Sequence, residues 1–135
     1  MNKKTKIIIG ALAFAVIIAL GFLTNYLVSV KRYKDAVSNI TIEHADASNI
    51  PDGSYIGECD VQYIYAKVEV QVEGGKITGI QLLKHKNERG KAAEGIEQEI
   101  VARQSIDVDV VAGATNSSQV IKKAVDNALS SAISH

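Results

Sequence analysis

The stretch Asp109-Val110-Val111-Ala112-Gly113-Ala114-Thr115-Asn116-Ser117-Ser118 joins a short β-branched run to a strongly amphipathic helical pattern. Gly113-Ala114 leaves the backbone uncrowded, so a bulky group can lie close to it. Asn116 or Ser117 can cap the helix that follows, which places Thr115 at the helix N-terminus. Unbonded N–H groups and the helix dipole attract anions there, so the stretch predicts a phosphate held near Thr115 or esterified to it. The alternative is an ordinary strand-to-helix turn with a Ser or Asn cap, since such caps are common.

The segments upstream of this stretch predict a small antiparallel sheet. A first strand is expected over about residues 53–59. Residues 63–73 then alternate between polar side chains and an apolar set, which indicates a half-buried strand with one covered face; the apolar set is Ile64, Ala66, Val68, Val70 and Val72. Gly74-Gly75 is a tight-hairpin signal, and residues 76–83 return as a third strand. The pattern predicts a hairpin or meander.

Two helices are expected to cover this sheet. Residues 92–103 have apolar side chains near helical spacing. Residues 117–131 carry a continuous apolar stripe opposite a face predicted to meet water; the water-facing residues are Lys122, Lys123, Asp126 and Asn127. Residues 106–111 form a short run that is strand or extended. The predicted fold class is α+β: a small antiparallel sheet covered by two helices and preceded by one transmembrane helix.

Residues 7–30 are almost entirely apolar. A helix over them is about 36 Å long at about 1.5 Å per residue, enough to cross a hydrocarbon core of about 30 Å. A cleavable signal peptide is the alternative, but its apolar region is usually about 7–15 residues long and ends in a small-residue cleavage site. Neither an Ala-x-Ala site nor a lipobox cysteine follows this run. The sequence therefore predicts an uncleaved anchor in the lipid bilayer.

The charges beside this anchor nearly balance. Three lysines precede it and three basic residues follow it, namely Lys31, Arg32 and Lys34. The acids that come next favour a cytoplasmic N-terminus and a C-terminal domain outside the cytoplasm. The predicted division is a basic N-terminus over residues 1–6, the anchor over 7–30, a juxtamembrane linker over 31–51 and a folded domain over 52–135.

The composition excludes several classes of function. The formal net charge is +0, so the chain has no basic surplus with which to bind nucleic acid. The one cysteine, Cys59, has no intrachain partner for a disulfide and is predicted to be structural. The sequence has no paired-Cys or Cys/His spacing, so no metal site is predicted. It also has no Ser-His-Asp or paired-carboxylate pattern, so no catalytic residue is predicted.

The pattern Asp-x-x-(Ser/Thr/Ala)-Gly-Ala-Thr-x-Ser at residues 109–117 resembles the attachment motif of the FMN-binding domain family. That family includes the C subunit of the sodium-translocating NADH:quinone reductase and the G subunit of its Rnf relatives. Asp52-Gly53-Ser54-Tyr55-Ile56-Gly57 is similar to the opening of the small, membrane-anchored, single-domain members, and residues 74–80 are similar to their hairpin. The resemblance covers about residues 52–132.

This resemblance implies that Thr115 carries FMN through a phosphoester installed by a flavin transferase outside the cytoplasm. Asp109 matches the leading acid of the motif, Gly113 and Ala114 match its centre, and Ala112 replaces the usual Ser or Thr. The further residues expected around the cofactor are Asn116, Ser117, Ser118, His85 and Glu88. Glu88 falls where the family often has a Glu-Thr-Pro-Gly loop near the flavin ring.

His85 is placed by sequence in a polar loop over residues 84–91. It is a candidate proton relay for flavin reduction, whereas a lone histidine in a charged loop is more often simply solvated. Glu94 is expected to be a solvated or capping acid.

The predicted function is that of a membrane-anchored, extracytoplasmic electron carrier with covalent FMN, rather than a self-sufficient enzyme. A donor in the membrane, linked to quinone or NADH, is the expected partner besides the transferase. Two alternatives stay open at this point: a non-redox binding or structural module that keeps the fold without flavin, and an accessory subunit of a larger membrane reductase.

Overall fold

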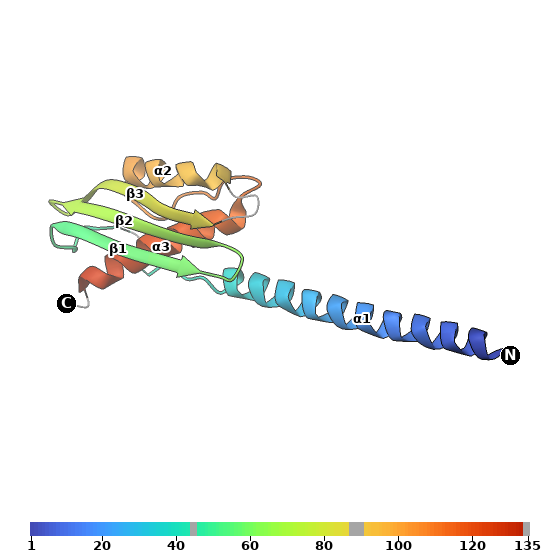
Figure 1. Cartoon of the computed structure of the whole chain (residues 1–135). Coiled ribbons are helices and arrows are strands. Elements are labelled where there is room, and N and C mark those ends of the chain that lie inside the picture. Colours follow the sequence, from blue (N-terminus) through green and yellow to red (C-terminus); the bar gives the residue numbers. More distant parts are fainter. Residues whose placement is uncertain (44–45, 87–90, 134–135) are drawn as a thin grey trace. The chain divides into compact units, whose positions relative to one another are not determined.

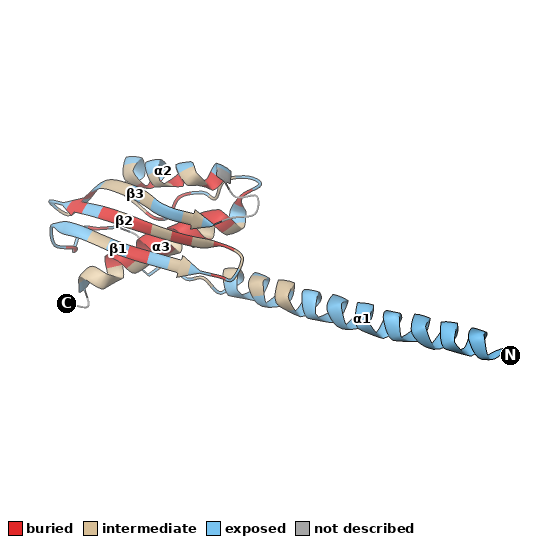
Figure 2. Cartoon of the chain, in the orientation of Figure 1, coloured by how far each residue is buried: buried red, intermediate tan, exposed pale blue. Residues whose placement is uncertain are grey.

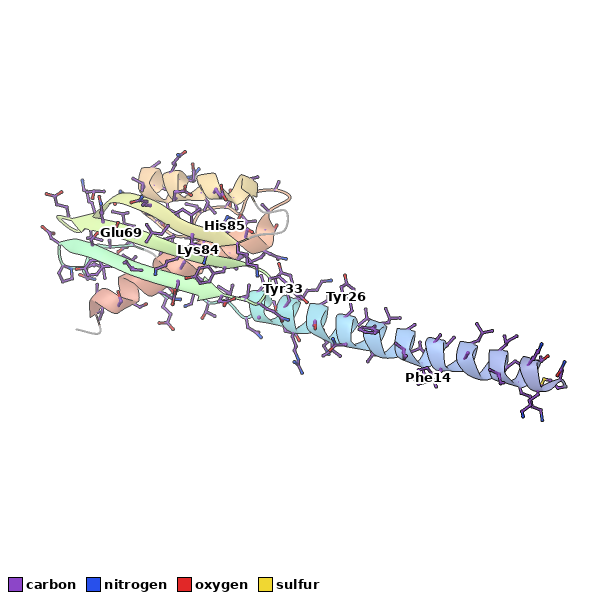
Figure 3. All side chains as sticks on the ribbon, viewed as in Figure 1. Phe14, Tyr26, Tyr33, Glu69, Lys84 and His85 are labelled. Carbon is purple, nitrogen blue, oxygen red and sulfur yellow. The ribbon has the colours of Figure 1, made fainter. Side chains whose placement is uncertain are left out.

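The computed structural model describes residues 1–43, 46–86 and 91–133. The chain forms two compact units, Met1–Asp35 and Ala36–His135. The first unit consists of most of helix α1 (Lys3–Ser38), which confirms the helix predicted over residues 7–30 and extends it at both ends. Its length and composition make it a candidate membrane span. None of its residues is buried within the protein (Figure 2), and the side chains of Phe14 and Tyr26 project from it (Figure 3).

The second unit contains a three-stranded antiparallel sheet in the order β1-β2-β3 (Figure 1). The strands are β1 (Gly53–Asp60), β2 (Tyr65–Glu73) and β3 (Lys76–Lys86), which confirms the predicted meander. The pairing of β2 with β3 is irregular at two places, between Lys67 and Val68 and between Gln71 and Val72. Strand β3 continues three residues beyond the predicted end at Leu83. This extension places His85 on a strand and not in a loop, so the predicted loop position of His85 is wrong.

One face of the sheet is covered by helices (Figures 1 and 2). Helix α3 (Thr115–Ile133) packs against β1 and β2, and helix α2 (Ile96–Arg103) packs against β3. The inward residues of β2 are buried, as their alternation predicts; they are Ala66, Val68, Val70 and Val72. The apolar stripe of α3 meets them and is also buried; it includes Val120, Ile121, Ala124, Val125, Ala128 and Leu129. The result is the α+β fold expected from the sequence.

The helix predicted over residues 92–103 is broken into two parts. Residues Lys91–Gly95 form a 3₁₀ turn, η1, and the α-helix begins only at Ile96. Gln104 ends α2 in the left-handed conformation, with φ 53°. Its side-chain Oε1 accepts a hydrogen bond from the Ile77 N–H at 2.8 Å, and its Nε2 donates to the carbonyls of Ile77 at 2.7 Å and Val101 at 2.8 Å. Gln104 therefore both closes the helix and pairs with the outer edge of β3.

Residues 106–111 have no regular secondary structure and do not join the sheet. The Lys122 ammonium donates to the carbonyl of Val108 at 2.8 Å, which ties this segment to α3. Lys122 is 7% exposed, so its predicted place on the water-facing side of the helix is wrong. An ammonium group can lie this deep because the carbonyl replaces part of its hydration.

Asp126 was also expected to face water, and this expectation is wrong because it is fully buried. Both of its carboxylate oxygens accept from the Glu43 N–H at 3.2 Å, and Lys123 Nζ lies 2.8 Å from Oδ2. The same ammonium donates to the carbonyl of Thr41 at 2.8 Å. Residues 41–43, within the segment predicted to be a linker, are therefore fastened to α3. Further along that segment, Ala47 and Ile50 are buried too.

Replacing Asp126 by asparagine is expected to lower the free energy of unfolding by about 2 kcal/mol, because hydrogen bonds to a charged group are lost inside the fold. For a domain of this size the melting temperature should fall by roughly 8–16 °C. Differential scanning calorimetry of the full chain in detergent measures this change. Asp107→Asn, at an exposed acid, is the matched control and should change stability by less than about 0.5 kcal/mol. Equal stability of the two variants would show that the hydrogen bonds of Asp126 contribute nothing to the free energy of unfolding.

Candidate functional site

The candidate site is built on the turn that leads into α3. The Ala114 N–H donates to the carbonyl of Val111 at 2.9 Å, and Gly113 adopts φ 80°, a conformation that suits glycine. A Cβ atom placed on Gly113 would meet no other group within 4 Å. The backbone here is thus open on one side, as the sequence predicts.

Ser118 holds this turn in shape. Its hydroxyl donates to the carbonyl of Ala114 at 2.8 Å and accepts from the Val111 N–H at 3.0 Å. The residue is fully buried. Both hydrogen bonds join Ser118 to the backbone of the turn. Ser118 therefore holds the backbone that leads into Thr115.

Helix α3 begins at Thr115, so the prediction that Asn116 or Ser117 caps the helix is wrong. Thr115 is the first helical residue and is exposed, so its hydroxyl is accessible to a large reactant. Asn116 is half-buried. Asp109 and Ala112 are exposed on the approach to the turn. The first turn of α3 contains no acidic residue, so no carboxylate within that turn offsets the positive end of the helix.

Ser117 occupies the first turn of α3 in an unusual way. It is 2% exposed, and its hydroxyl oxygen has no hydrogen-bond partner within the described part of the chain. A buried hydroxyl without a partner costs about 1–3 kcal/mol, so such groups are rare unless a ligand satisfies them. A phosphate oxygen is the type of acceptor that suits this position, and the positive end of the helix favours its charge.

His85 has surroundings very different from those predicted. Its side chain is 2% exposed, and Nδ1 donates to Glu94 Oε1 at 3.0 Å. Glu94 is therefore a partner of a buried imidazole and not only a solvated acid. Glu88, predicted near the flavin ring, lies outside the described residues.

Two further groups bear on the chemistry of this domain. Glu97, one turn after Glu94, was not singled out by sequence; burial raises the pKa of its carboxyl, and the charge of Glu94 raises it further. The spacing of three residues between these two acids was the signal available.

Burial also raises the pKa of the Cys59 thiol, which makes it a poor nucleophile and agrees with a structural cysteine.

Residues 63–130 match the FMN-binding domain family. The chain belongs to that family. The match begins two residues before β2, runs through most of α3 and includes Thr115, Gly113 and Ser117. Helix α1 as a candidate membrane span and the FMN-binding domain together fit a membrane-anchored FMN-binding protein.

Other comparisons add a solved structure. Among curated proteins none matches the chain significantly. The chain is similar to the CPE2226 protein from Clostridium perfringens, known from a crystal structure, with 26% sequence identity and a TM-score of 0.49. The similarity covers 63% of this chain and 90% of that one.

Proposed function

We propose that the chain is an electron carrier in which FMN is joined to Thr115 by a phosphoester, with the FMN-binding domain outside the cytoplasm. The observation that carries the proposal is the exposed Thr115 hydroxyl at the first position of α3, beside the open backbone of Gly113. The family match supports FMN as the cofactor. The ester bond to Thr115 goes beyond the family match, and the exposed position of Thr115 supports it.

Each part of the turn has a task in this proposal. In the transferase reaction the Thr115 oxygen would form a bond to the phosphorus of the FMN group of a dinucleotide flavin donor. The phosphoanhydride bond of that donor would break, and the nucleoside monophosphate would leave with the Thr115 proton, so the chain would gain one FMN less one water. The backbone N–H groups at the start of α3 receive the phosphate charge. The buried Ser117 hydroxyl would donate to a phosphate oxygen. Gly113 leaves room for the group that is attached, and Ser118 keeps the turn in place.

FMN supplies one- and two-electron chemistry when bound, and the protein supplies attachment, exposure and electrostatics. A domain outside the cytoplasm cannot rely on a cytoplasmic pool of FMN, so a covalent bond prevents loss by dissociation. Helix α1 confines the domain to the membrane surface, which raises its encounter rate with a membrane donor linked to quinone or NADH. A flavin transferase is the partner required for maturation.

The electron-carrier role is tested by redox cycling. The full-length chain, loaded by co-expression with a flavin transferase and purified in detergent, is reduced with dithionite under anaerobic conditions and reoxidised with ferricyanide. The expected result is complete loss and full return of the visible flavin absorption. A loaded chain whose flavin neither bleaches nor recovers would contradict the carrier role.

Ser117→Ala separates a phosphate contact from a structural role. In the chain without FMN, the variant is expected to be as stable as the parent or more stable by up to about 1 kcal/mol, because an unsatisfied buried hydroxyl is removed. After co-expression with the transferase, the yield of covalently bound FMN is expected to fall several-fold. Thermal unfolding and the ratio of flavin absorption to protein measure the two effects. A loss of stability with normal loading would assign Ser117 to packing alone.

A further inference from the structure

A groove lies between strand β3 and helix α2, which pack against each other (Figure 1). It is open to solvent and has a volume of about 360 Å³. Its lining residues are Gly79 and Ile80 of β3 and Glu97, Gln98, Val101 and Ala102 of α2. No described residue that was assigned to FMN is among them. Ligand pockets usually measure about 300–1,000 Å³, so this groove suits a small occupant such as one long side chain.

Glu97 brings an incompletely bonded carboxylate to this groove. The residue is half-buried, and its Oε2 is buried without a hydrogen-bond partner within the described ranges. Burial raises the pKa of the carboxyl by more than the hydrogen bond from its own backbone N–H lowers it. Rotation about the last side-chain bond of a glutamate is easy, so either oxygen can turn toward the groove. A cationic donor suits this carboxylate best, because it supplies both a hydrogen bond and the opposite charge.

The ion pairs of the described residues leave Glu97 without a cation. On α2 itself, the guanidinium of Arg103 pairs with Glu99. The other two pairs join His85 to Glu94 and Lys123 to Asp126. The cation that Glu97 lacks therefore has to come from a bound partner.

The sequence around the groove attracts cations at longer range. Residues 92–109 contain five acidic residues and one basic residue, a formal charge of −4. Residues 36–135 contain fourteen acidic and nine basic residues, a formal charge of −5, because six of the basic residues of the chain flank the anchor. A surface of one charge speeds association with a partner of the opposite charge.

We propose that the groove between β3 and α2 binds an arginine side chain of a partner protein, with the guanidinium paired to Glu97. The stem of the arginine lies along the apolar wall formed by Ile80, Val101 and Ala102. Arginine fits better than lysine because its planar guanidinium makes two parallel hydrogen bonds to a carboxylate and is less strongly hydrated. Arginine is also enriched at the centres of protein interfaces. The inference goes beyond the proposed function and does not depend on flavin at Thr115.

The first test is an NMR titration of the full-length chain in detergent with n-propylguanidinium, which has the structure of an arginine side chain. The backbone amide signals of Gly79, Val101 and Ala102 are followed. They are expected to shift, and n-propylurea, a neutral molecule of nearly the same shape, is expected to bind at least about tenfold more weakly because it lacks the charge. Equal binding of the two molecules would overturn the pairing with Glu97.

Two variants locate the binding. Glu97→Gln keeps the size of the side chain and should weaken n-propylguanidinium at least about tenfold, because the charge is lost. Glu99→Gln removes an exposed acid of the same helix and is the matched control, expected to change the affinity less than about twofold. Ala102→Leu should also weaken binding, because it fills the groove from an exposed position that tolerates a larger side chain. Unchanged affinity in both Glu97→Gln and Ala102→Leu would place the cation elsewhere and overturn the inference.

A capped tripeptide with arginine between two valines separates a protein partner from a free small cation. It is expected to bind several-fold more tightly than n-propylguanidinium, because its apolar side chains contact the exposed rim of the groove. A peptide that binds no better would overturn a protein as the occupant. The same titration of Thr115→Ala, which carries no flavin in the proposed function, should give the same affinities. Failure of this binding leaves the proposed function standing, and a parent that takes up no FMN leaves this binding standing.

Discussion

Thr115→Ala is expected to reduce covalently bound FMN to background, because the variant lacks the hydroxyl that forms the phosphoester. The other two hydroxyls of the turn are poor substitutes. Ser118 is fully buried and uses its hydroxyl in two hydrogen bonds with the backbone, and Ser117 is 2% exposed. Thr115, in contrast, is exposed. The measurement is in-gel flavin fluorescence of the denatured chain after co-expression with a flavin transferase.

Thr115→Ser is the matched control for this experiment, since it keeps a hydroxyl at the same position and should keep covalent flavin. The alanine variant should remain folded, because an exposed side chain at a helix start contributes less than about 1 kcal/mol. Fluorescence retained in Thr115→Ala would keep the flavin but place its attachment at another residue. Fluorescence lost in both variants and present in the parent would show that the transferase requires threonine itself.

Gly57→Ala is expected to give the largest loss of stability, at least about 3 kcal/mol, because no space exists for the added methyl group. A Cβ atom at this position would lie 2.1 Å from the Ala124 carbonyl oxygen and 2.3 Å from the Ala128 nitrogen. Both are backbone atoms of α3, so relief requires that the helix move away from β1. Such a movement would open the core formed by α3 with β1 and β2.

Urea denaturation followed by tyrosine fluorescence measures this loss, since the chain has 5 tyrosines and no tryptophan. Gly79→Ala on β3 is the matched control. Its Cβ would meet only the side-chain oxygen of Gln71, at 3.4 Å, and this flexible group can shift. The control should lose less than about 1 kcal/mol. Equal stability of the two variants would contradict the close approach of α3 to β1.

The sequence predicts most of the fold because its periodic patterns are strong. The alternation along β2 and the stripe on α3 each identify one apolar face, and both faces are buried. The close approach of Gly57 to α3 could not be predicted, because no local pattern says which glycine meets which helix. The end of β3 was missed for a related reason. Lys84 and Lys86 meet solvent on the open face, so the segment resembles a loop, although the side chain of His85 between them is buried.

The candidate site was predicted in part. The open glycine turn and the helix start near Thr115 follow from residue types that have strong local preferences. The predicted cap lies two or three residues late, at Asn116 or Ser117, because both are common N-cap residue types, whereas the Ser117 side chain is turned into the protein. Lys122 and Asp126 were assigned to water because charged residues are seldom buried. Their partners lie at Val108 and at residues 41–43, and such long-range pairings leave no local signal.

The most direct test of covalent attachment is the intact mass of the full-length chain after co-expression with a flavin transferase. A gain of one FMN less one water, with yellow colour that survives denaturation and a modified peptide containing Thr115, is the predicted result. No gain in mass, while the same transferase modifies another substrate, would contradict the phosphoester at Thr115.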